Sequence, residues 1–128
     1  GTIKSAVVHS KDGLDEVSIS APTRMVLIAD GKLVESMIDP EDLGLSLSNM
    51  EDLVAHDLKE ATRFVRDSVS GVLSGGVREM VVINVALGLF LADRVQDLSE
   101  GVQMANKTID SGRANETLVN WAKISFSK

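Results

Sequence analysis

Cysteine is absent from this 128-residue chain. The absence excludes disulfides and thiolate metal sites within the chain, and it fits a reducing compartment such as the cytoplasm. The chain contains two histidines, His9 and His56, and two histidines without cysteine give no zinc signature.

Aromatic residues make up only 3% of the chain, and the net charge is −6. Few aromatics leave few platforms on which single-stranded nucleic acid can stack. The lysines and arginines are scattered among acidic residues, whereas binding to a phosphate backbone needs them clustered. We therefore expect no nucleic-acid partner, although an acidic chain can still bind phosphates through a divalent cation.

Long hydrophobic runs are also missing. The longest, residues 80–92, is interrupted by Asn84 and Gly88 and is shorter than the roughly 20 residues that span a bilayer. It indicates a buried helix, and no membrane association is expected. Residues 1–5 lack the basic start and apolar run of a signal peptide.

The residues that are present favour an aliphatic core, because apolar side chains make up 44% of the chain. The β-branched run in residues 6–8 predicts a buried strand. Polar residues 10–16 predict a loop that leaves this strand, and the alternation in residues 17–20 is compatible with another short strand.

Asp30-Gly31 lies between two β-type runs, residues 23–29 and 32–38. An Asp-Gly linker in this position predicts a hairpin, because a type I′ turn needs a positive φ at both central residues. Pro40 cannot donate to a sheet ladder, so the hairpin is expected to end before it.

The spacing of apolar residues predicts about four helices in the second half of the chain. Asp57 with Glu60 forms a capping box, which we favour as the first helix start over the competing pair Ser48 and Glu51. The expected helices cover residues 58–73, residues 77–93, the segment from Asp97 or Ser99 to Gly112, and residues 114–125.

The third expected helix has a buried stripe, and the fourth is expected to bury three side chains. The stripe comprises Val102, Ala105 and Ile109, and the three side chains are Leu118, Trp121 and Ala122. One strand, one hairpin and about four helices indicate an α/β or α+β fold. The sheet is thin for so many apolar helices, which points to a fragment or to an obligate partner.

The strongest chemical candidate is the carboxylate pair Asp15-Glu16, on the loop after the first strand. Two such carboxylates can hold Mg²⁺ while waters and substrate phosphates fill its other positions. Gly13 allows the backbone to turn sharply before them. On chemistry alone, the bland alternative of a solvated dipeptide is favoured, because a lone carboxylate pair is a weak signal.

Other polar residues favour structural interpretations. His9 could serve as a general base or a ligand, but a histidine at a strand end is more often structural. Asn84, inside an apolar helix, is expected to bond a nearby backbone. Ser74-Gly75-Gly76 lacks the ending of a phosphate-binding loop and predicts a helix–helix turn, and Arg78-Glu79 predicts a surface pair or an anchor for neighbouring loops.

Several segments, in this order, resemble anthranilate phosphoribosyltransferase. Residues 7–10 (Val-Val-His-Ser) and 13–16 (Gly-Leu-Asp-Glu) resemble the strand and metal loop of that family. Residues 21–23 and 39–45 resemble the segments that flank its hairpin, residues 78–86 its Arg-Asp-x-Val-Leu-Leu-Asn-Ala helix, and residues 101–114 its C-terminal signature. Each motif is short, but their shared order over nearly the whole chain makes the match specific.

The resemblance implies a partial nucleoside phosphorylase/phosphoribosyltransferase-type α/β domain. The family joins anthranilate to 5-phosphoribosyl 1-pyrophosphate in tryptophan biosynthesis and releases pyrophosphate. By resemblance, Asp15 and Glu16 are the carboxylates that hold Mg²⁺, which neutralises the departing pyrophosphate. Residues 1–128 would then be the C-terminal portion of the catalytic domain.

Other family features have no counterpart here. The family's Gly-Thr-Gly-Gly-Asp loop, its Lys-His-Gly segment, its anthranilate-contacting arginine and its dimer-forming helical domain all lie upstream of the residue that matches Ala6. We therefore expect no catalytic residue in this chain and no activity without the rest of the catalytic domain. Glu79 stands where the family usually has Asp, and residues 54–56 replace a Gly-rich stretch.

Two alternatives remain open from the sequence. The chain could belong to a pyrimidine nucleoside phosphorylase, which shares the general fold, although residues 13–16 favour the transferase. It could also be a non-catalytic interaction domain that kept the fold.

Overall fold

A computed structural model describes residues 3–126 of the chain. Three strands, β1 (Lys4–Ser10), β2 (Thr23–Ala29) and β3 (Lys32–Ile38), form an antiparallel sheet in the order β1-β2-β3. Asp30 and Gly31 connect β2 to β3 with φ of 50° and 69°. The hairpin and its turn, with both central residues at positive φ, are therefore confirmed.

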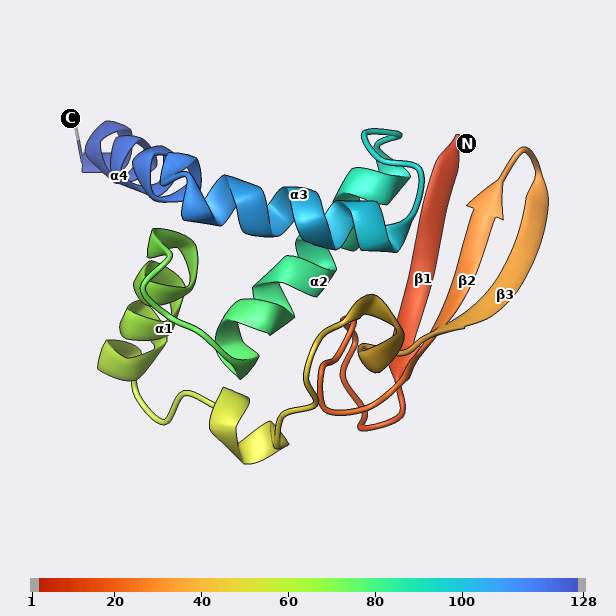
Figure 1. Ribbon diagram of the computed structural model, residues 1–128, viewed down its shortest axis with the longest axis horizontal. Coiled ribbons are helices and arrows are strands. Elements are labelled where there is room, and N and C mark those ends of the chain that lie inside the picture. The colour runs from red at the N-terminus through yellow and green to blue at the C-terminus, as the bar shows by residue number, and fades with distance from the viewer. Residues whose placement is uncertain (1–2, 127–128) are drawn as a thin grey trace.

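The helices follow the sheet and lie to one side of it (Figure 1). Two short 3-10 helices, η1 (Glu41–Leu43) and η2 (Met50–Leu53), lead into four α-helices. The α-helices are α1 (Leu58–Ser70), α2 (Gly76–Leu91), α3 (Leu98–Asp110) and α4 (Arg113–Phe126). The mixed α/β class and the expected number of helices are confirmed.

Side-chain caps fix the starts of α1 and α3. The Asp57 carboxylate accepts the Glu60 N–H at 2.7 Å, and the Asp97 carboxylate accepts the Glu100 N–H at 2.8 Å. Each bond satisfies a donor that the first helical turn leaves unpaired. The Asp57 start is confirmed, whereas the competing pair at Ser48 precedes only the short helix η2.

The centre of the molecule is the crossing of α2 and α3. Val82, Ile83 and Ala86 from α2 are buried against Val102, Ala105 and Ile109 from α3. A Cβ added to Gly101 would lie 2.9 Å from the Cα of Ala86, so the two backbones approach as closely as glycine allows. The predicted buried stripe of the third helix is confirmed.

The face of the sheet that contains Met25 and Ile38 joins this core, and α2 contacts β1. Lys4 fastens β1 to the end of α2: its Nζ donates to the Phe90 carbonyl oxygen at 2.6 Å and lies 3.8 Å from the centroid of the Phe90 ring. It also pairs with Asp93 at 2.8 Å.

The first strand is present but is not fully buried, which corrects that part of the prediction. Val7 is 62% exposed and pairs across the sheet with Val26. Both alternate along their strands with Val8, Met25 and Leu27, which pack in the core, and so they lie on the opposite face of the sheet. The β-branched run indicated the strand, but it could not show that one face would stay open.

Two further expectations are wrong. Residues 17–20 form no strand: Val17 and Ile19 are completely buried in a loop, and their backbone groups bond side chains and another loop. Leu118, Trp121 and Ala122 were expected to be buried, but no residue of α4 is buried: Trp121 is 69% exposed, Ala122 is exposed and Leu118 is half-buried. Among the residues described, no helix is both long and apolar enough to cross a membrane.

Candidate metal loop

The carboxylate pair Asp15-Glu16 lies on a compact loop between β1 and β2. The loop closes on itself where β1 ends: the Ser10 N–H donates to the Leu14 carbonyl at 2.9 Å, and the Gly13 N–H donates back to the Ser10 carbonyl at 3.0 Å. Gly13 has a φ of 96°, which side chains with a Cβ rarely adopt. The expectation that Gly13 makes a sharp turn before the acids is confirmed.

The two residues that flank the acidic pair are held by their backbones. Besides its bond to Ser10, Leu14 donates its N–H to Asp12 Oδ1 at 3.2 Å. On the other side, Val17 donates its N–H to Asn84 Oδ1 at 3.0 Å and accepts from Asn84 Nδ2 at 2.8 Å. The acidic pair is therefore a two-residue tip between two anchored positions.

Asp12 organises the inner side of the loop. Its Oδ2 accepts a hydrogen bond from Ser18 Oγ at 2.6 Å and another from Ser20 Oγ. Partial burial raises the pKa of the Asp12 carboxyl, but hydrogen bonds from Ser18, Ser20, Ser10 and the Leu14 N–H together lower that pKa to about 2. Asp12 is therefore ionised at neutral pH and already engaged within the loop.

Asp15 and Glu16 are both exposed. Within residues 3–126, no hydrogen bond or ion pair engages either carboxylate, in contrast to Asp12. No group of three or more possible metal ligands forms in this described part of the chain. The donor set fits Mg²⁺, which binds through one or two carboxylates and retains waters and phosphate oxygens at its other positions.

The other candidates have structural roles or lie apart. His9 is exposed, on the face of the sheet opposite the helices, and His56 is exposed just before α1. Arg78 donates to Asn106 at 2.8 Å and to Asp110 at 2.7 Å, so it anchors α2 to α3. Glu79, the departure from the family pattern, accepts the Ser46 N–H at 3.2 Å and holds the segment before η2.

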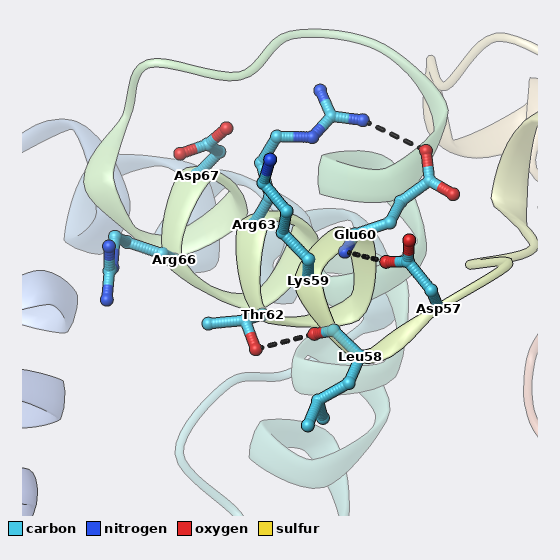
Figure 2. Close-up of a pocket in the computed structure, with 8 residues that line it drawn as sticks. All are labelled: Asp57, Leu58, Lys59, Glu60, Thr62, Arg63, Arg66 and Asp67. Carbon is cyan, nitrogen blue, oxygen red and sulfur yellow. Dashed lines mark hydrogen bonds and ion pairs between the residues drawn. The ribbon is translucent and has the colours of Figure 1, made fainter.

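A wide hollow on the surface lies away from this loop. It lies at the start of α1, and Figure 2 shows that its lining residues all come from the segment 57–67. Several of its polar groups bond within the same segment: Glu60 pairs with Arg63 at 3.2 Å, and Thr62 Oγ1 donates to the Leu58 carbonyl at 2.7 Å. A hollow lined by one helical segment does not enclose a ligand.

Sequence reasoning found the acidic pair but missed the residues that hold it. Asn84 was expected to bond a nearby backbone, and it does donate to the Met80 carbonyl at 2.9 Å, but its two other bonds reach Val17, 67 positions away. The spaced serines Ser18 and Ser20 were a signal for a shared acceptor, although nothing in the sequence identified Asp12 as that acceptor.

Comparison with known proteins places the chain in a class. Residues 1–115 match the glycosyl transferase family, a/b domain, and the chain belongs to this family. It is similar to the anthranilate phosphoribosyltransferase of Thermoanaerobacter sp. (strain X514), with 40% identity over 118 residues, which cover 92% of this chain and 35% of the relative.

Two solved structures share the fold. The crystal structure of anthranilate phosphoribosyltransferase from Thermus thermophilus superimposes with a TM-score of 0.82 at 26% identity, over 92% of this chain and 34% of that one. A variant of the Saccharomyces cerevisiae enzyme with Mg bound gives 0.79 at 28% identity, over 90% and 33%. This chain spans about a third of the length of the relatives it matches.

Proposed function

We propose that this chain is the C-terminal portion of the catalytic domain of a cytoplasmic anthranilate phosphoribosyltransferase. The whole enzyme would join anthranilate to 5-phosphoribosyl 1-pyrophosphate and release pyrophosphate. The observation that carries the proposal is the anchored acidic loop in a chain that is 40% identical to such an enzyme. The similarity runs across the loop, the hairpin and the helices and is not confined to one motif.

In this proposal, Asp15 and Glu16 hold the metal side of the active site. Bound Mg²⁺ would supply positive charge that stabilises the departing pyrophosphate. The chain itself would contribute the two carboxylates of Asp15 and Glu16, presented from an anchored loop. The Asp12 carboxylate would not compete for the cation, because Ser18 and Ser20 already donate hydrogen bonds to it. No residue of this chain is assigned a catalytic role.

The isolated chain is proposed to be inactive, because it provides only one wall of such a site. The uncovered face of the sheet fits this view, since it contains Val7 and Leu33, which are 62% and 72% exposed. Exposed apolar side chains that share one face of a sheet often mark a surface that contacts another part of the protein or a partner. We propose that the rest of the catalytic domain covers them.

The test uses both the purified chain and the full-length protein that contains it. With anthranilate, 5-phosphoribosyl 1-pyrophosphate and Mg²⁺, the full-length protein should consume anthranilate, which is measured as a decrease in its fluorescence. The chain alone should cause no such decrease. Product formation by the chain would overturn the inactivity. Phosphorolysis of thymidine by the full-length protein would instead identify a pyrimidine nucleoside phosphorylase, and no turnover of either substrate would favour an interaction domain.

A charge-removing variant tests the metal assignment. In the full-length protein, Asp15→Asn combined with Glu16→Gln should abolish Mg²⁺-dependent turnover, because amides bind Mg²⁺ much more weakly than carboxylates. The matched control is Glu41→Gln with Asp42→Asn, an exposed acidic pair on η1 that removes the same charge. Equal behaviour of the two double variants would contradict the assignment.

A further inference from the structure

The helix α2 contains one amide that the apolar core does not require. Asn84 lies between the buried residues Ile83 and Ala86, and asparagine is a poorer helix former than the alanine and leucine that follow in the same helix. Its side chain uses both donors and one acceptor: Nδ2 donates to the carbonyls of Met80 and Val17, and Oδ1 accepts the Val17 N–H. Two of these three bonds reach across to the acidic loop.

The Asn84 side chain pairs with the backbone of Val17 as a neighbouring β-strand would, with one bond donated and one accepted. Val17 is completely buried, and both of its backbone polar groups are paired with the same amide, at 3.0 and 2.8 Å. Attachment of β1 to α2 does not depend on this pair, because Lys4 already fastens the strand at Phe90 and Asp93. The Asn84 amide therefore holds the loop at Val17, the residue that directly follows Glu16.

We propose that Asn84 is a positioning residue for the metal loop, because it clamps the backbone of Val17 and so holds Asp15 and Glu16 in the arrangement that grips Mg²⁺. The inference rests on the proposed function of that acidic pair. Asp12 anchors the opposite side through Leu14, so the two acids lie between two anchored residues. Loss of the clamp should loosen the tip on one side and lower the affinity for the cation.

The diagnostic variant is Asn84→Leu in the full-length protein. It has nearly the same shape, changes no charge, and favours the helix, so a loss of cation affinity cannot come from electrostatics or from unwinding of α2. The matched control is Asn106→Leu in α3. It also removes a helical amide with a side-chain partner, Arg78 at 2.8 Å, but it does not touch the loop.

Cation affinity is measured with the metal alone. Mn²⁺ binding is followed by electron paramagnetic resonance, with Mg²⁺ as competitor, and hydrogen exchange reports the Val17 amide. We expect Asn84→Leu to weaken Mg²⁺ binding roughly 10-fold, the lower end for residues that orient metal ligands, and to expose the Val17 amide to exchange. In turnover, the Mg²⁺ concentration for half-maximal rate should rise while the KM for anthranilate stays unchanged. Asn106→Leu should do none of this.

Two outcomes separate this inference from the proposed function. If Asp15→Asn with Glu16→Gln removes Mg²⁺ binding while Asn84→Leu binds as tightly as Asn106→Leu, the clamp is irrelevant and only the positioning role is overturned. If the double variant also leaves Mg²⁺ binding intact, the metal assignment itself is wrong, and the positioning role is overturned with it.

Discussion

Substitution of Gly101 by alanine should destabilise the crossing of α2 and α3. The added Cβ would lie 2.9 Å from both the Cα and the Cβ of Ala86 and 3.0 Å from its carbonyl oxygen. Two of these atoms are backbone, so no flexible side chain can swing aside, and α3 must move away from α2. Overpacking of this kind costs about 1–3 kcal/mol, and here the upper end applies.

The helix itself gains from the same change, because alanine is better than glycine in a helix by at most about 1 kcal/mol. The net loss should therefore be about 2 kcal/mol. For a chain of this size, that lowers the Tm by roughly 6–12 °C. Urea and thermal denaturation followed by circular dichroism would measure both quantities on the purified chain.

Gly88→Ala provides the matched control. Gly88 is exposed in the last turn of α2, and a Cβ there would meet nothing within 4 Å. The Gly88→Ala variant should gain the better helix propensity of alanine without a steric clash, and so its free energy of unfolding should rise by up to about 1 kcal/mol. The reasoning is refuted if Gly101→Ala is as stable as Gly88→Ala, since the close approach of the two backbones would then have no energetic consequence.

Three further changes test local features. Asp97→Ala should cost about 1 kcal/mol in urea denaturation, because the Glu100 N–H loses its cap, whereas Asp97→Asn should be nearly neutral. Gly31→Ala should cost about 1 kcal/mol, because φ is 69° there, and Gly31→Asn should be milder; equal urea midpoints for both would contradict the turn assignment. Asp12→Asn tests how the free energy of unfolding changes at acidic pH. The pKa of the Asp12 carboxyl is lowered to about 2, so its contribution is complete above the ordinary value of 3.8 and is lost as pH falls through 2. Allowing for solvent screening of this exposed group, the variant should be about 1 kcal/mol less stable at pH 6 and converge with the parent near pH 2. A difference that stays constant with pH would exclude this account.

Local signals allowed much of the fold to be predicted. The turn at Asp30-Gly31 and the cap at Asp57 depend on residues within four positions of each other, so the sequence alone was enough to indicate them. The helical spacing of Val102, Ala105 and Ile109 likewise predicted a buried face, because that face packs mainly on α2.

Features that depend on distant partners were not predictable in the same way. Residues 17–20 alternate as a strand does, yet the partner of Val17 is a side chain on α2, and a single sequence does not show that pairing. Trp121 follows the helical spacing of a buried position, but α4 lacks a neighbour on that side within residues 3–126. In the candidate site, Asp15 and Glu16 could be found because they are consecutive in the sequence. The roles of Asp12 and Asn84 could not, because they depend on contacts that form only when the loop folds.

The attachment of Lys4 also has a consequence for the order of folding. Its partners Phe90 and Asp93 lie 86 and 89 positions later in the chain, so β1 can dock only after α2 is complete. Contacts of such long sequence separation slow folding, because the entropy of closing the loop opposes them until they form. During synthesis, the three strands would emerge well before the helix α2 that β1 contacts, and the nascent sheet would be most prone to aggregation in that interval.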